Sequence, residues 1–371
     1  MIDNLNIKKL GFGLMRLPKN ESGYDFGELN KMVDAFMSKG FTYFDTAYVY
    51  DDGGSEEAFK KSVAQRYPRD SYLLADKMPV WCCETHEDLE KIFNTSLERT
   101  GAGYFDFYLN HSLSKSKLDK IDELGVFEFI QKKKEQGFIK HAGFSFHDSA
   151  EVLDEILTKH PEQEFVQLQI NYYDWLSDNV QSKKCYDVAR KHGKPVIIME
   201  PVRGGSLAVL PDKARKILLE AEPEMSIASW ALRFASSLDG VITVLSGMSD
   251  LSQMTDNLSF MDLQKEFTEN EFKKVMDVAD ILNKIPTVPC TSCGYCLEGC
   301  PMNIKINKMF SVYNNYLKYN NKFKTRYEYN EVVNSGSGAV GDCIDCGACA
   351  SVCPQHIDIP EKLREFNESV I

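Results

Sequence analysis

The sequence of 371 residues predicts an α/β protein, a (β/α)8 TIM barrel followed by a small α+β domain rich in cysteine. Three observations support this prediction. Eight short apolar runs alternate with amphipathic segments between residues 10 and 246. Five of the amphipathic segments stop at a glycine just before the next run. Eight of the 11 cysteines lie between residues 290 and 353.

The apolar runs have the pattern of parallel strands. Most are continuously apolar rather than alternating, as expected when helices cover the outside of a sheet. Their ranges are 10–17, 41–46, 72–77, 105–110, 139–145, 165–170, 195–200 and 241–246. Eight strand-then-helix units fit a barrel. A doubly wound open sheet is the alternative, but Leu10-Gly11-Phe12-Gly13 lacks the third glycine and the following helix of a phosphate-binding turn.

The segments between the runs have the periodicity of helices. In residues 26–39 the apolar side chains recur at spacings of three and four, which gives one buried stripe. Thr85 and Asp88 have the spacing of a capping box at the start of another helix. The helix-ending glycines adopt the left-handed conformation without steric cost. They are Gly40, Gly101, Gly137, Gly193 and Gly240.

Charge and hydropathy exclude some functions. Lys and Arg number 43 against 55 Asp and Glu, so the formal net charge is −12. An acidic surface repels phosphate backbones and anionic lipid, so we expect neither nucleic-acid binding nor membrane binding. The sequence has no apolar run long enough for a membrane helix and no signal segment near its first residues. We therefore expect a cytoplasmic protein.

The cysteines divide the chain into two domains, which we predict at residues 1–284 and 285–371. Two copies of a C-x2-C-x2-C-x3-C-P motif begin at Cys290 and Cys343. In this motif three cysteines bind one [4Fe–4S] cluster and the fourth binds its neighbour. The first predicted set is Cys290, Cys293, Cys296 and Cys353, and the second is Cys343, Cys346, Cys349 and Cys300. The alternatives are a zinc ribbon, which leaves four cysteines idle, and disulfides, which a reducing cytosol disfavours.

Polar residues lie where three of the predicted strands end. Asp45 ends the second strand, Lys77 the third and His111 the fourth, and Tyr50 follows Asp45 by five positions. Polar groups at the C-terminal ends of barrel strands are usually catalytic. The sequence therefore predicts that an acid, a phenol, an amine and an imidazole meet at one barrel mouth.

These residues give the chain a resemblance to the aldo/keto reductase family. Asp45-Thr46-Ala47-Tyr48-Val49-Tyr50, Lys77 and the segment that ends at His111 match the family's Asp, Tyr, Lys and His tetrad. The resemblance covers roughly residues 8–260. The cysteine motifs resemble bacterial two-cluster ferredoxins, which makes the chain most similar to the iron–sulfur branch of the family, found mainly in anaerobes.

The resemblance implies a mechanism. Tyr50 would protonate the alkoxide that forms when a nicotinamide gives hydride to a carbonyl carbon. A free phenol, with a pKa of about 10, is a weak acid for this task. We expect Lys77 to lower the pKa of Tyr50, Asp45 to hold Lys77 in place, and His111 to donate to the carbonyl oxygen.

The resemblance also implies a site for NADPH or NADH. Ser145 and Gln167 match the residues that hold the carboxamide, and Arg203 would face the pyrophosphate. Gly247 and Gln253 stand where the family often has cations for the NADP 2′-phosphate, which makes NADH a serious candidate. The full predicted set is Ser145, Gln167, Met199, Pro201, Arg203, Gly204, Gly247, Gln253 and Asn257.

We consider three functions. The first is an NAD(P)H-dependent oxidoreductase that reduces a small-molecule carbonyl and carries two [4Fe–4S] clusters for electron transfer or for structure. The second is a ferredoxin-linked electron-transfer oxidoreductase, flavin-assisted, in which the clusters feed or drain the barrel site and a redox partner protein docks. The third is a redox sensor.

Some residues are assigned less sharply. Cys82 and Cys83 follow Lys77 and are either loop thiols or pocket residues. Trp81 and Tyr24 lie on loops that could border the substrate pocket. We expect the run at residues 132–134, three lysines, to be a solvated helix face.

Overall fold

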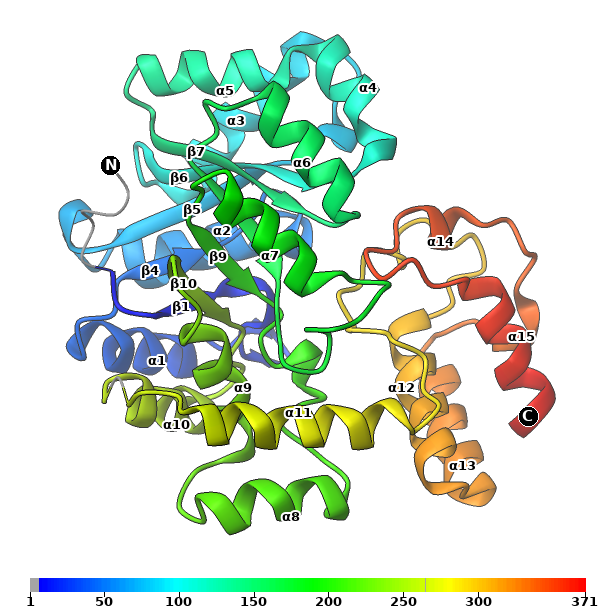
Figure 1. The fold of residues 1–371 in the computed structure, drawn as a ribbon. Helices are drawn as coiled ribbons and strands as arrows, with labels where there is room; N and C mark the ends of the chain where they lie inside the picture. Colours follow the sequence, from blue (N-terminus) through cyan, green and yellow to red (C-terminus); the bar gives the residue numbers. More distant parts are fainter. Residues whose placement is uncertain (1–6, 264) are drawn as a thin grey trace.

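The computed structural model describes residues 7–263 and 265–371. It consists of a barrel and a smaller helical domain that lies beside it (Figure 1). The two domains have separate hydrophobic cores, one built from residues up to Ala279 and one from Val288 onward. The predicted boundary between residues 284 and 285 falls just after helix α11 (Glu269–Asn283) and stays a prediction.

Eight parallel strands close the barrel in the order β1-β10-β9-β8-β7-β6-β5-β4, and β4 pairs with β1. Their bounds are β1 (Leu10–Gly13), β4 (Tyr43–Asp45), β5 (Leu73–Met78), β6 (Phe105–Leu113), β7 (Ile139–Phe146), β8 (Phe165–Gln169), β9 (Val196–Met199) and β10 (Val241–Ser246). Aromatic and branched side chains fill the interior, among them Tyr43, Phe107 and Phe165. The predicted barrel is confirmed.

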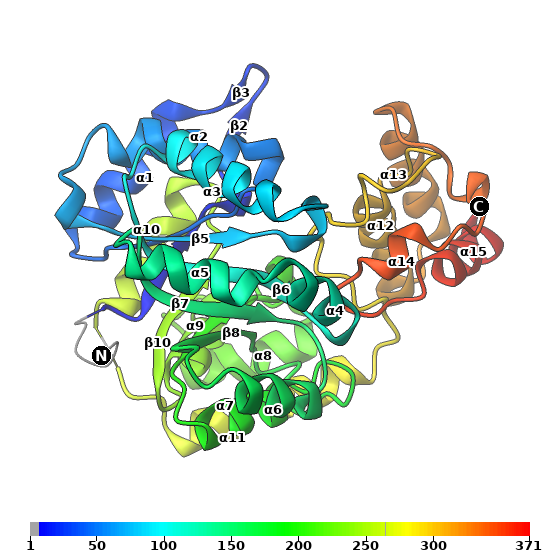
Figure 2. The same cartoon turned by 90° about the horizontal axis from the view of Figure 1, so that it is seen from above.

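Helices surround the barrel, as both ribbon views show (Figures 1 and 2). In chain order they are α1 (Phe26–Ser38), α2 (Gly54–Phe59), α3 (His86–Thr100), α4 (Lys115–Leu124), α5 (Val126–Glu135), α6 (Ala150–Lys159), α7 (Ser182–Lys191), α8 (Asp212–Ala221), α9 (Ile227–Ser236), α10 (Leu251–Met261) and α11. A two-stranded hairpin, β2 (Lys19–Asn20) and β3 (Gly23–Tyr24), precedes α1.

The predicted capping box and helix-ending glycines are present, and the first strand ends earlier than expected. The Asp88 carboxylate accepts the backbone N–H of Thr85 at 2.9 Å, as a capping box requires. Gly40, Gly101, Gly137, Gly193 and Gly240 all have positive φ. The first strand is shorter than expected, because a turn at Leu14–Arg16 follows Gly13. The carbonyl of Leu14 accepts the hydroxyl of Ser55 at 3.0 Å, so this segment is tied to α2.

The lysine run at residues 132–134 differs from the expectation at its middle position. Lys133 is 7% exposed, and its ammonium lies 2.7 Å from the carboxylate of Glu90. The same group lies over the rings of Phe93 and Phe129. The face that these lysines share is therefore only partly solvated, because the aliphatic part of Lys133 covers the core while its charge is paired.

The smaller domain is helical where we expected α+β. Its helices are α12 (Ile306–Tyr319), α13 (Lys322–Asn334), α14 (Ala348–Ser351) and α15 (Ile359–Val370), and the structure assigns no strand within residues 285–371. The insert between the two cysteine motifs forms α12 and α13. Phe310 and Tyr313 of α12 pack with Phe366 of α15, so helices supply the core that hairpins would otherwise provide.

Within the described ranges, 7–263 and 265–371, no helix combines the length and the apolar content that crossing a bilayer demands.

Candidate active site

A buried ion pair stands at the end of neighbouring strands. Lys77 of β5 is fully buried, and its Nζ lies 2.7 Å from Oδ1 of Asp45 at the end of β4. The ammonium also donates to the carbonyl of Thr46 at 2.6 Å. Burial raises the pKa of the Asp45 carboxyl, and the charge of Lys77 opposes that rise. Because Asp45 and Lys77 end adjacent strands, the barrel topology itself brings them together.

Tyr50 extends this pair into the barrel mouth. Its hydroxyl lies 3.4 Å from Nζ of Lys77, which also sits 4.8 Å from the centre of its ring. Burial, and then the negative charge of Asp45, raise the pKa of Tyr50 well above its ordinary value. We expected Lys77 to lower that pKa, but burial and the charge of Asp45 dominate in the packed site.

The third group, His111, is 2% exposed and lies against Tyr50, with the two ring centres 6.0 Å apart. Burial, and then the charge of Lys77, hold the pKa of His111 well below its usual range. The imidazole is therefore neutral at physiological pH and carries one N–H. Asp45, Tyr50, Lys77 and His111 thus meet at one place, as the sequence predicts; their roles stay predictions.

A residue that the sequence analysis missed reaches into the same place. Tyr295 lies between Cys293 and Cys296 of the first cysteine motif, and its hydroxyl is 3.1 Å from Nε2 of His111. Tyr295 also lines the same cavity as Tyr50. A signal existed in the sequence, because the second motif carries Ala348 at the corresponding position.

A cavity of about 480 Å³ opens over these groups. Both domains line it, with Asp45 and Tyr50 from the barrel and Cys293 and Tyr295 from the smaller domain. Seven of the nine residues predicted to hold a nucleotide also line it, namely Gln167, Met199, Pro201, Gly204, Gly247, Gln253 and Asn257. Most of the residues predicted to hold the nucleotide therefore line the same cavity as Asp45 and Tyr50 of the tetrad.

The cavity offers a free acceptor for an amide. Gln167 is 2% exposed, and its Oε1 has no hydrogen-bond partner among the residues that the structure describes, while its Nε2 contacts Sδ of Met199 at 3.6 Å. A buried amide oxygen without a partner is costly unless a ligand satisfies it. The carboxamide N–H of a nicotinamide is a donor of the right kind, so the residues present fit the group that the sequence implies.

Two of the predicted nucleotide residues do not line the cavity. Ser145 accepts the backbone N–H of Ser112 at 2.7 Å, and its O–H can still donate to another group. Arg203 is 7% exposed, and its Nε lies 3.2 Å from both carboxylate oxygens of Asp174. The roles predicted for Ser145 and Arg203 toward a nucleotide stay predictions.

The smaller domain is fastened to the barrel mouth at further points. Gln355, which follows the second motif, exchanges two hydrogen bonds with Gln169 of β8, at 3.1 and 2.7 Å. Arg16 donates to the carbonyl of Thr291 at 3.0 Å. A Cβ on Gly204 would lie 2.2 Å from that carbonyl oxygen, so glycine at position 204 allows the two backbones to approach.

The eight clustered cysteines fall into two quartets. One small cavity is lined by Cys290, Cys293, Cys296 and Cys353, and another by Cys300, Cys343, Cys346 and Cys349. These are the two sets that the motif rule predicts. Among the described residues no three acidic, histidine or cysteine side chains close around a point as ligands of a single ion would. The quartets suit a larger group such as a [4Fe–4S] cluster better than a zinc ion.

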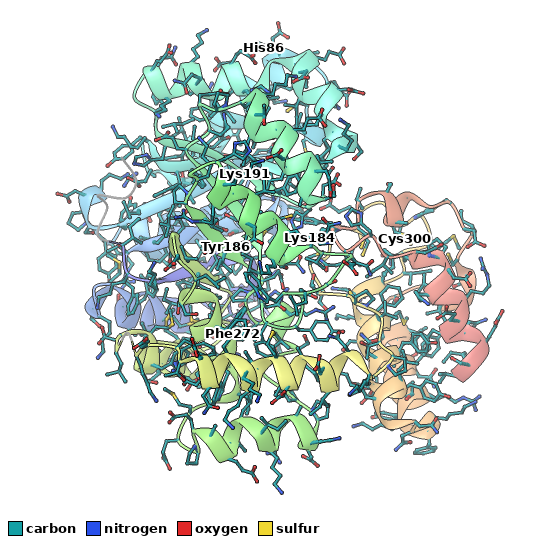
Figure 3. All side chains as sticks on the ribbon, viewed as in Figure 1. His86, Lys184, Tyr186, Lys191, Phe272 and Cys300 are labelled. Carbon is teal, nitrogen blue, oxygen red and sulfur yellow. The ribbon has the colours of Figure 1, made fainter. Side chains whose placement is uncertain are left out.

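The two quartets differ in their surroundings. Cys293 of the first quartet lines the active-site cavity, whereas Cys346 of the second is exposed. Ile344 and Val352, beside the second quartet, are 60% and 47% exposed. Figure 3 shows Cys300, a member of the second quartet, within the smaller domain. One quartet therefore faces the barrel and the other reaches the surface.

Four loop residues that the sequence left open lie at different distances from the cavity. Neither Cys82 nor Cys83 lines the cavity; the first is exposed and the second is buried against the carbonyl of Pro79. Trp81 packs on His111, with ring centres 5.0 Å apart, so it does border the tetrad. Tyr24 packs on Phe26 and does not line the cavity.

Comparison with known proteins agrees with this geometry. The profile of the aldo/keto reductase family matches residues 9–280, well over half of the chain. The chain belongs to the aldo/keto reductase family. Residues 289–357 match the 4Fe-4S dicluster domain. This aldo/keto reductase is therefore an oxidoreductase that carries an iron–sulfur domain, as the resemblance implied.

Two similar proteins align with this aldo/keto reductase over most of their own length. The uncharacterized oxidoreductase YqkF of Bacillus subtilis is 23% identical over 300 residues, covering 73% of this chain and 92% of that protein. The solved aldo-keto reductase AKR11C1 from Bacillus halodurans, in its holo form, has a TM-score of 0.61 at 24% identity, covering 74% of this chain and 93% of that one.

A second solved structure is an aldo/keto reductase from Klebsiella pneumoniae in complex with NADP and acetate. It has a TM-score of 0.60 at 18% identity and covers 74% of this chain and 92% of its own. At these identities the two solved structures establish the shared fold.

Proposed function

We propose that this aldo/keto reductase catalyses the nicotinamide-dependent reduction of a small carbonyl compound to an alcohol, with Tyr50 as the proton donor. The observation that carries the proposal is the convergence of Lys77 and His111 on Tyr50, which lines the cavity together with seven of the nine predicted nucleotide residues. The reaction balances, since the carbonyl carbon gains a hydride and its oxygen gains one proton.

Each member of the tetrad has a task in this proposal. A reduced nicotinamide, when bound, supplies the hydride. Tyr50 holds the proton that the alkoxide takes up, and Nε2–H of the neutral His111 orients the carbonyl oxygen. Lys77, paired with Asp45, keeps positive charge near the oxygen where negative charge develops.

The raised pKa of Tyr50 bears on its role as an acid. A phenol with a raised pKa stays protonated throughout the neutral range, so its proton is present for an alkoxide. The same rise makes Tyr50 a weaker acid, so the proposal relies on the neighbouring groups to stabilise the charge that develops as the proton leaves.

The nucleotide would lie along the wall that Gln167, Gly247 and Gln253 help to form. Nε2 of Gln253 donates to Oδ2 of Asp250 at 2.7 Å, and Asp256 places a carboxylate in the lining of the cavity. A 2′-phosphate prefers cations, so this end of the cavity suits NADH at least as well as NADPH. Titration of the protein with each nucleotide measures the preference.

The cysteine quartets would hold two [4Fe–4S] clusters, each of which supplies one-electron transfer when bound. Gly294 and Gly347 both have positive φ, which lets the backbone of each loop turn toward its cluster. Iron and sulfide analysis of anaerobically purified protein tests the number of clusters.

Tyr50→Phe tests the proposed acid. General acid catalysis contributes about 100-fold to 10,000-fold, and we expect turnover of the best carbonyl substrate to fall by a factor in that range. Tyr327→Phe is the matched control, because Tyr327 is 63% exposed and does not line the cavity. Full turnover by the Tyr50 variant would show that this hydroxyl is not the acid.

A second candidate function, exchange of single electrons between the clusters and the cavity, rests on Cys293, which lines that cavity together with Tyr50. The exposed second quartet would then receive a redox partner protein. A nicotinamide moves two electrons as hydride whereas a cluster moves one, so this function needs a converter of the flavin class.

Anaerobic addition of NADH or NADPH without substrate separates the two candidates. Under electron exchange, the nucleotide bleaches cluster absorbance and produces the EPR signal of reduced [4Fe–4S], and cluster-free protein releases a yellow chromophore. Under simple carbonyl reduction the clusters stay oxidised, while a panel of carbonyl compounds consumes nucleotide.

A further inference from the structure

Tyr295 contacts one of the two groups that the proposed reaction assigns to the carbonyl oxygen and lines the same cavity as the other. Its hydroxyl is 3.1 Å from Nε2 of His111, and Tyr295 and Tyr50 both line the cavity. Trp81 flanks the ring of Tyr295, with ring centres 6.4 Å apart. Tyr295 comes from the smaller domain, 184 positions after His111.

A phenol oxygen at this position resembles a bound carbonyl oxygen. The neutral imidazole of His111 has one N–H, and that N–H can serve either the oxygen of Tyr295 or the oxygen of a substrate. The two oxygens also cannot occupy the same volume. The site is thus filled by a side chain of the protein itself in the position that the substrate requires.

The loop that carries Tyr295 is built for this contact. Cys293 and Cys296, both in the first quartet, flank the tyrosine. The carbonyl of Thr291 is held by Arg16 at 3.0 Å, which fastens the start of the loop to the barrel. The second motif carries Ala348 at the corresponding place. A cluster loop therefore does not need a tyrosine here for its own fold.

We propose that Tyr295 gates the carbonyl site. Its hydroxyl fills the oxygen position between Tyr50 and His111, and a substrate binds when the cysteine loop carries Tyr295 aside. This inference rests on the proposed carbonyl reduction. It makes Tyr295 a residue that determines affinity and the room left for the substrate, and not a proton donor.

Tyr295→Phe tests the gate in the full-length protein, purified anaerobically with its clusters. The variant removes only the competing hydroxyl. With nucleotide saturating, we expect the KM for benzaldehyde to fall about tenfold, the factor of one net hydrogen bond, while kcat stays within about twofold. Calorimetric titration with acetate, whose oxygens accept the same hydrogen bonds, should show a Kd about tenfold lower.

Other results would overturn the gate. A fall in kcat at constant KM would make Tyr295 part of the catalytic machinery, and unchanged KM and Kd would make it a packing residue. Tyr327→Phe, in the same domain but exposed, is the matched control. The iron content of both variants must equal that of the wild type.

A measurement on the unaltered protein avoids any effect of substitution on folding. Saturating acetate and oxidised nucleotide should speed hydrogen exchange in the peptide that spans residues 290–300, because the loop is displaced. Slower or equal exchange would contradict the gate. If no carbonyl compound is reduced by either protein, the proposed function fails, whereas acetate binding and hydrogen exchange still decide the role of Tyr295.

Discussion

Breaking the ion pair between Asp45 and Lys77 should destabilise the barrel more than breaking a surface pair of the same length. The two charges are 2.7 Å apart, which corresponds to an attraction of about 6 kcal/mol at an effective dielectric constant of 20. Their side chains are only 5% and 0% exposed, so desolvation offsets much of this attraction while the pair is intact. Removing one partner leaves the other charge buried and unpaired.

We therefore expect Asp45→Asn and Lys77→Met each to lower the free energy of unfolding by about 3–5 kcal/mol. The double variant buries no charge and should lose far less than the sum of the two. The exposed pair Lys115 and Glu155, 2.9 Å apart with side chains 59% and 57% exposed, is the control and should contribute under about 1 kcal/mol.

The assay is anaerobic urea unfolding of the cluster-loaded protein, followed through the fluorescence of Trp175 and Trp230, both buried in the barrel. The coupling free energy from the four proteins of the cycle isolates the pair. Single variants within about 1 kcal/mol of the wild type, or strict additivity in the double variant, would refute the argument.

Three further predictions concern pH and the clusters. Because the pKa of Tyr50 is raised and that of His111 is depressed, carbonyl reduction should be independent of pH from about 6 to about 9, and a bell-shaped rate profile inside that range would contradict this. Burial and a neighbouring carboxylate raise the pKa of Asp76 well above its ordinary value. The contribution of Asp76 to the free energy of unfolding is therefore fully present below the unfolded pKa of about 4, and it is lost as pH rises toward the folded pKa. Asp76→Asn should therefore stabilise the protein more at pH 8 than at pH 5, as urea unfolding at both values would show. Cys353→Ser should halve the iron content although Cys353 belongs to the second motif, whereas Cys185→Ser, in the barrel, should leave it unchanged.

Much of the candidate site could be predicted because its residues are tied to local features. Asp45, Lys77 and His111 each follow an apolar run, and strands of a parallel barrel end at the same mouth. Their convergence therefore needs no knowledge of side-chain contacts. The cysteine quartets follow in the same way from spacing alone.

Some contacts of the predicted residues are not encoded by spacing. Arg203 lies in a glycine-rich loop, and its Nε lies 3.2 Å from the carboxylate of Asp174 on the β8 side of the barrel. Ser145 accepts the backbone N–H of Ser112 on the neighbouring strand. The pKa of Tyr50 depends on how deeply the phenol is buried and on the nearby charge of Asp45, and both are properties of the packed site.

The sequence by itself predicted the barrel, the grouping of the cysteines into two sets across the motifs and the convergence of the tetrad, because each depends on periodicity or spacing within short segments. Only the tertiary structure decided that the smaller domain closes over the barrel mouth. The contacts of Tyr295 with His111 and of Gln355 with Gln169 join residues more than 180 positions apart. Such contacts depend on how two separately cored domains dock, and no local pattern specifies that.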